Sequence, residues 1–170
     1  MKPWMAENQL EWILDHIPDP GYFVEHGAGG SSVWFHDRLK PTQKHLAIEC
    51  NWEWAEKVKA RCPNTEVWRT RHHHIRHKDG MEHSCFCPEY IGHGSFQHAD
   101  VIVVDGFNRG PVLSWISWHA KNGCHVFIHD FGYIPFVWAL HLPPFKDHEI
   151  VESKDHKANP NSLLRVRVER

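Results

Sequence analysis

The stretch VEHGAGGSS, at residues 24–32, decides the fold of this 170-residue chain. A short apolar run at residues 22–24 leads into it, and three glycines follow Glu25 within five positions. Glycine lets the backbone turn sharply and lets a ligand approach it closely, and serine is a favoured first residue for a helix. The stretch therefore predicts a strand, a tight turn and a helix that begins near Ser31 or Ser32.

The same alternation of strands and helices continues along the chain. The clearest buried strand is the β-branched run at residues 101–104, which is typical of a parallel sheet covered on both faces. Further strands are expected at 45–49, 65–70, 124–128, 148–152 and 163–168. Helices are expected at 5–16, 31–40, 52–61, 111–120 and from about 131 to 141, whereas residues 71–98 are expected to be irregular.

This order predicts one α/β domain that spans residues 1–170. Strands that alternate with helices form a parallel sheet with right-handed crossovers, and the last two strands are close enough in sequence to pair antiparallel. The expected fold class is therefore a Rossmann-like, doubly wound, mostly parallel sheet with an antiparallel C-terminal strand pair.

Composition excludes several classes of protein. The chain is 41% hydrophobic and 24% charged, with a formal net charge of −2, which argues against a generally basic nucleic-acid-binding protein. No apolar run has the length of a signal peptide or a membrane span, so no membrane partner is expected. The five cysteines form no regular framework, which indicates free thiols and a cytoplasmic location.

Acidic residues stand at the ends of four expected strands: Glu25, Glu49, Asp105 and, after His129, Asp130. In an open α/β sheet, ligands bind beyond these carboxyl ends. Glu49 lies 22 residues after the first glycine, Gly27, where a carboxylate can accept both hydroxyls of a ribose. A ligand that contains adenosine is therefore expected, although Ser32 stands where the dinucleotide fingerprint has its third glycine.

These segments resemble the motifs of the class I S-adenosylmethionine-dependent methyltransferases. VEHGAGGSS is similar to the first motif of that family, AIECNWEWAEKV to the second, ADVIVVDGFNR to the fourth-strand motif and GCHVFIHDFG to the fifth-strand segment. The resemblance implies S-adenosylmethionine as cofactor, with Glu25 at its methionine end and Glu49 at its ribose. The implied cofactor contacts are Glu25, His26, Gly27, Ala28, Gly29, Ser31, Glu49, Cys50 and Asp105. His26 departs from the family pattern, as does the absence of an acidic or polar adenine contact near residues 69–71.

The resemblance also implies where methyl transfer would take place. Asp105, His129 and Asp130 are the expected catalytic residues, on a rim shared with Asn108 and Arg109, and His129 is the preferred base by residue type. Some small O-methyltransferases of this class hold a divalent cation through carboxylates at these two strand ends. Asp105 and Asp130 are accordingly candidate ligands for magnesium or a similar ion, although the usual Asp-Asn pair at the fifth strand is absent.

The histidine- and cysteine-rich stretch at residues 69–87 leaves alternatives open. Its histidines and cysteines offer zinc ligands without matching a common zinc signature, and its arginines offer contacts to phosphate. A solvated loop is the simplest interpretation. The favoured function is methyl transfer to a small molecule or to an unidentified acceptor, with O-methylation as one candidate reaction. Exposed tryptophans offer a homo-oligomer interface. The alternatives are a non-catalytic module that binds metal or nucleic acid through 69–87, and a nucleotide-dependent oxidoreductase.

Overall fold

A seven-stranded sheet forms the centre of the computed structural model, which describes residues 1–70, 74–76, 82–84, 87–131, 141–154 and 162–170. Its strands are β1 (Gly21–His26), β2 (Gln43–Glu49), β3 (Glu66–Arg69), β6 (Val101–Val104), β7 (His125–His129), β8 (Phe145–Glu152) and β9 (Ser162–Val168). The helices are α1 (Glu7–Asp15), α2 (Gly30–His36), α3 (Trp52–Arg61), α4 (Pro88–Ile91), α5 (Arg109–His119) and the 3-10 turn η1 (Gly94–Gln97). A separate hairpin pairs β4 (His74–Arg76) with β5 (Glu82–Ser84).

The strand order of the sheet is β3-β2-β1-β6-β7-β9-β8. The five strands from β3 to β7 are parallel, and β9 runs antiparallel to both of its neighbours, β7 and β8. The order reverses between β1 and β6, so the two strands that flank this point send their connections in opposite directions. This arrangement confirms the expected fold class, including the antiparallel C-terminal pair.

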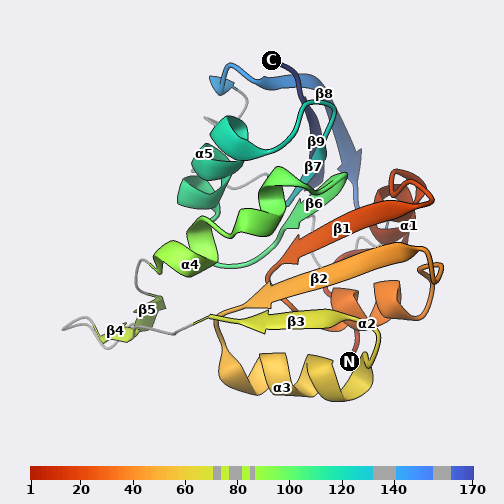
Figure 1. Ribbon diagram of the computed structural model, residues 1–170, viewed down its shortest axis with the longest axis vertical. Coiled ribbons are helices and arrows are strands. Elements are labelled where there is room, and N and C mark those ends of the chain that lie inside the picture. The colour runs from red at the N-terminus through yellow and green to blue at the C-terminus, as the bar shows by residue number, and fades with distance from the viewer. Residues whose placement is uncertain (71–73, 77–81, 85–86, 132–140, 155–161) are drawn as a thin grey trace.

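Helices cover both faces of the sheet (Figure 1). On one face, α1 and α2 pack over a cluster that includes Phe23 and Val103. On the other face, α4 and α5 pack over a larger cluster that includes Val24, Ile102 and Val104. Neighbouring residues of one strand belong to opposite clusters because side chains alternate across a sheet. Continuous apolar strands such as β6 are thereby buried on both sides.

The structure differs from the expected elements mainly between residues 71 and 98. Where an irregular segment was expected, the chain forms the β4–β5 hairpin, α4 and η1. Pro88 begins α4 with a favourable fixed backbone angle, and burial of Tyr90 and Ile91 in the core stabilises this short helix. β8 begins at Phe145, three residues before the expected strand, because Phe145 packs into the core.

Two expectations lie outside the described residues. The helix expected to run to about residue 141 falls on residues 132–140. Most of the histidine- and cysteine-rich stretch at residues 69–87 also lies outside the described residues, so the binding of metal or phosphate by this stretch stays a prediction. Among the helices that the structure does describe, none is both long and apolar enough to cross a membrane.

Candidate functional site

A cavity of about 360 Å³ lies at the point where the strand order reverses. This is where open α/β sheets bind their ligands, because connections that leave in opposite directions open a crevice between the strand ends. The wall includes the turn after β1, the ends of β2 and β6, the start of α3 and part of the N-terminal segment. Its lining residues are Lys2, Trp4, Gly27, Ala28, Gly29, Gly30, Ser31, Glu49, Asn51, Trp54, Tyr90, Asp105, Gly106, Phe107, Arg109 and Asp130.

Two glycines let the turn after β1 and the loop after β6 meet at the floor of this cavity. Gly27 has a φ of +95°, and a β-carbon there would lie 2.6 Å from the backbone nitrogen of Gly106. A β-carbon on Gly106 would lie 1.9 Å from the Tyr90 hydroxyl and 2.9 Å from the His26 ring. The absence of side chains at these two positions therefore permits the close approach of the two loops.

Glu49 joins the end of β2 to the glycine turn. One of its carboxylate oxygens accepts a hydrogen bond from the Ala28 amide at 2.8 Å, and the other accepts one from the Asn51 amide at 2.6 Å. Burial raises the pKa of Glu49, although these amide hydrogen bonds oppose the shift. Each carboxylate oxygen can accept more than one hydrogen bond, so Glu49 retains acceptor capacity at the cavity wall.

Glu25, by contrast, faces away from the cavity and lies beneath α2. Its carboxylate accepts hydrogen bonds from the hydroxyls of Ser31 and Ser32, the latter at 2.5 Å, and it lies 3.4 Å from His45 Nε2. The residue is completely buried. Glu25 therefore fastens the first turn of α2 to β1, and Ser31, which lines the cavity, stands between it and any ligand.

The expected cofactor contacts thus fall into two groups. Gly27, Ala28, Gly29, Ser31, Glu49 and Asp105 line the cavity, whereas Glu25, His26 and Cys50 lie behind its wall. Burial, helped by the charge of Arg109, lowers the pKa of His26 to about 3. Burial and the neighbouring Glu49 raise the pKa of the Cys50 thiol to about 12. Both side chains are therefore neutral near pH 7, and neither is a thiolate nucleophile or a charged ligand contact.

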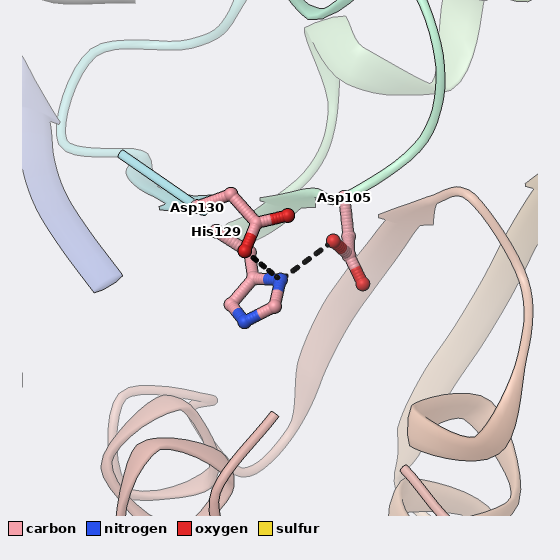
Figure 2. Close-up of side chains that lie close together, drawn as sticks. All are labelled: Asp105, His129 and Asp130. Carbon is pink, nitrogen blue, oxygen red and sulfur yellow. Dashed lines mark hydrogen bonds and ion pairs between the residues drawn. The ribbon is translucent and has the colours of Figure 1, made fainter. Parts of the chain in front are cut away.

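The three expected catalytic residues lie together at the ends of β6 and β7 (Figure 2). His129 Nδ1 lies 2.8 Å from Asp105 Oδ1 and 3.6 Å from Asp130 Oδ1. Asp130 adopts a φ of +57°, which turns the chain just after β7. Asp105 and Asp130 line the cavity, whereas the His129 side chain is only 2% exposed and is not among its lining residues. His129 therefore supports the two carboxylates from behind.

Arg109, at the start of α5, connects the same two carboxylates. Its guanidinium donates hydrogen bonds to Asp105 Oδ1 and to Asp130 Oδ2, both at 3.1 Å. It also donates to the backbone carbonyls of Asp105, Gly106 and His129. Arginine presents its donors in a rigid planar fork that suits this kind of bridging. The strand-end cluster is consequently a hydrogen-bonded network of two carboxylates with Arg109 as its cation.

Sequence reasoning missed three aromatic residues of the site, Tyr90, Trp4 and Phe107, whereas Trp54, which follows Glu49 closely in sequence, does line the cavity. Tyr90 comes from the segment expected to be irregular; its ring lies 4.0 Å from that of His26 between centroids, and its hydroxyl reaches the cavity floor. Trp4 and Phe107 are 88% and 62% exposed and line the same cavity. Phe107 stands two residues after the strand-end Asp105, which is a usable local signal. No local sequence pattern indicates Trp4, because this residue lies at the cavity only when the N-terminal segment packs against the end of the sheet.

Comparison with solved structures gives a consistent fold. No protein-family model and no curated protein matches the sequence. An RNA methyltransferase from Salinibacter ruber, solved with S-adenosyl-L-homocysteine, is 11% identical with a TM-score of 0.63, covering 98% of this chain and 94% of that one. An O-methyltransferase from Bacillus cereus, solved with SAH, is 14% identical with a TM-score of 0.62, covering 96% and 82%.

A third similar structure is a SAM-dependent O-methyltransferase from Thermotoga maritima, which is 12% identical with a TM-score of 0.66 and covers 100% of this chain and 68% of that one. Because the sequence identities are so low, these structural similarities establish the fold alone. The chain has the Rossmann-like fold of class I S-adenosylmethionine-dependent methyltransferases, in agreement with the family resemblance of its motifs.

Proposed function

We propose that this protein is an S-adenosylmethionine-dependent methyltransferase. The observation that carries the proposal is the cavity at the reversal of strand order, where the glycine turn, the Glu49 carboxylate and the Asp105 strand end meet. Similar structures with this fold were solved with S-adenosylhomocysteine, the product of the same cofactor. A nucleotide-dependent oxidoreductase is less well supported, since Ser32 replaces the third glycine of the dinucleotide fingerprint.

The cofactor would lie across the strand ends with its ribose at Glu49. The carboxylate of Glu49 is already oriented by the Ala28 and Asn51 amides, so it would accept the ribose hydroxyls without reorganisation. The methionine end would lie along the glycine turn. Glu25 would act there through Ser31, which bonds to Glu25 and also lines the cavity.

In the proposed reaction, the acceptor attacks the methyl carbon as the bond from that carbon to sulfur breaks. The electron pair of the broken bond stays on sulfur, S-adenosylhomocysteine leaves, and a hydroxyl acceptor loses its proton to a base. Asp130 is the best placed base, because it lines the cavity and its buried Oδ1 has no hydrogen-bond partner among the described residues. Arg109 would hold that carboxylate in position through its hydrogen bond to Asp130 Oδ2.

We propose a small molecule as the acceptor, methylated on oxygen. Trp4 and Phe107 expose apolar rings at the cavity, and such rings suit a planar or apolar molecule that must be held close to the methyl group. The structures similar to this chain include RNA methyltransferases as well as O-methyltransferases, so RNA is the competing acceptor. Transfer of a labelled methyl group to the small-molecule fraction or to the RNA fraction of an extract distinguishes the two.

Calorimetric titration with S-adenosylmethionine, S-adenosylhomocysteine and NAD tests the cofactor assignment. We expect micromolar binding of both sulfur ligands and none of NAD. Glu49→Gln removes the charge but keeps the shape, and should weaken binding about tenfold, the effect of weakening charge-assisted hydrogen bonds by about 1.4 kcal/mol.

The matched control is Glu11→Gln, at an exposed position on α1, which should bind as the unmodified protein does. Circular dichroism establishes that both variants are folded. Absence of binding by either sulfur ligand would overturn the proposed function.

A further inference from the structure

Asp105, His129 and Asp130 have the composition of a metal site. Each offers one ligand atom, and these three atoms lie within 4.8 Å of one another (Figure 2). Carboxylate oxygens are the ligands that magnesium and similar cations prefer. Whether a cation can bind here depends on the hydrogen bonds that these three residues already make.

N–H donors already point at the carboxylates. His129 Nδ1 lies 2.8 Å from Asp105 Oδ1, and since an ionised carboxylate only accepts hydrogen bonds, this nitrogen is the one that carries a proton. A protonated ring nitrogen cannot ligate a metal ion. The Arg109 guanidinium bonds to both carboxylates at 3.1 Å. These residues therefore do not fit a resident divalent cation.

Arg109 is also firmly held in this position. Besides the two carboxylates, it donates hydrogen bonds to three backbone carbonyls, those of Asp105, Gly106 and His129, at 2.9 to 3.1 Å. Its side chain is only 14% exposed. A metal ion would have to displace a bonded guanidinium from the ends of two strands at once, and the displaced positive charge would then lie beside the incoming cation.

We infer that Arg109 is the built-in cation of this site: it holds Asp105 and Asp130 together and keeps divalent metal ions out. Methyl transfer by this protein is consequently independent of metal ions, a part of the inference that rests on the proposed function. Two carboxylates and one guanidinium leave one net negative charge at the cavity. That charge suits a sulfonium, which is itself a cation. Arg109 thus acts as a positioning residue.

Binding of Mn²⁺ to chelator-treated protein, followed by electron paramagnetic resonance, tests the exclusion of metal without any measurement of activity. The unmodified protein should show no stoichiometric Mn²⁺ binding below about millimolar concentration. Arg109→Met removes the charge and frees both carboxylates, so it should gain a site at least about tenfold tighter, as between close carboxylates that no longer have a counter-charge. The double variant Arg109→Met/Asp130→Asn should lose it again.

Two further variants separate the charge of Arg109 from other effects. Arg109→Lys keeps the charge and should remain free of Mn²⁺. Arg165→Met removes an arginine that pairs with Glu149 at 2.7 Å on β8, and it should create no site, because it frees only one exposed carboxylate.

Stoichiometric Mn²⁺ binding by the unmodified protein that disappears in Asp130→Asn would overturn the inference, whether or not Arg109→Met folds. A folded Arg109→Met that gains no Mn²⁺ site would overturn it as well. If S-adenosylmethionine fails to bind while these Mn²⁺ results hold, the proposed function fails and the exclusion of metal stands.

Discussion

His26 illustrates at the residue scale how the site depends on buried groups that touch no ligand. Its imidazole is fully buried against the Tyr90 ring, and neither ring nitrogen has a hydrogen-bond partner among the described residues. Burial lowers the pKa of His26 to about 3, so the folded protein keeps this ring neutral. The ring then supports Tyr90, whose hydroxyl lies beside Gly106 on the cavity floor.

This depressed pKa predicts a loss of stability in mild acid. The unfolded chain protonates His26 near pH 6.5, whereas the folded protein does so only near 3, so stability falls as the pH drops between these values. Between pH 6.5 and 4.5 this single group contributes a loss of about 2.3 kcal/mol in the free energy of unfolding, because the unfolded chain is already half protonated at pH 6.5. Urea unfolding of His26→Phe at several pH values should show a smaller loss by about that amount.

His98 is exposed, so His98→Gln serves as the control for this experiment. Its loss of stability in acid should match that of the unmodified protein. If His26→Phe loses as much stability in acid as the unmodified protein, His26 does not titrate as its burial implies.

At the scale of elements, the start of α3 connects helix stability to the cavity wall. Asn51 precedes the helix, and its side-chain oxygen accepts hydrogen bonds from the amides of Glu53 and Trp54 at 3.0 and 3.2 Å. Its own amide donates to the Glu49 carboxylate. The residue that begins α3 therefore also orients the carboxylate proposed to bind the ribose.

Asn51→Ala should lower the free energy of unfolding by about 1 kcal/mol, the usual effect of removing a helix N-cap. Asn51→Ser keeps a capping oxygen and should retain most of that stability. Urea unfolding followed by circular dichroism measures both. Equal losses in the alanine and serine variants would show that the cap contributes nothing here.

At the scale of the whole molecule, the N-terminal segment crosses from α1 to the cavity. A β-carbon on Gly30 would lie 2.3 Å from the carbonyl oxygen of Lys2, so this segment contacts the first turn of α2. Lys2 and Trp4 consequently line a cavity whose other walls come from distant parts of the chain. The site is complete only when this segment lies on the sheet end.

Trp4→Ala therefore tests the path of the N-terminal segment. Because Trp4 is 88% exposed, its loss should change the free energy of unfolding by no more than about 0.5 kcal/mol. Its ring should nevertheless contribute to ligand binding, so calorimetry should show binding of S-adenosylhomocysteine weakened about fivefold, or by about 1 kcal/mol.

Trp118 on α5 is similarly exposed, at 71%, and is not among the residues that line the cavity, so Trp118→Ala should bind the ligand as the unmodified protein does. Equal affinities in the Trp4 and Trp118 variants would contradict a role for the N-terminal segment.

The sequence by itself determined the order of the elements and the edge of the sheet where the cavity lies. The glycine turn at residues 27–30 and the β-branched run of β6 are local patterns, and local geometry limits what backbone they can form. Acidic residues at the ends of parallel strands must meet at one edge, because the carboxyl ends of such strands all lie there. Glu49, Asp105 and Asp130 could therefore be assigned to one site without coordinates.

Only the tertiary structure decided which strand-end side chains reach the cavity. Glu25 and Glu49 both stand at strand ends, yet Glu25 faces α2 and Glu49 faces the cavity, because packing of the helices over each face selects the direction. The contacts of Arg109, and the arrival of Tyr90 and Trp4, depend on segments that are far apart in sequence. Local patterns carry no record of such contacts, since these form only when the helices and loops pack on the finished sheet.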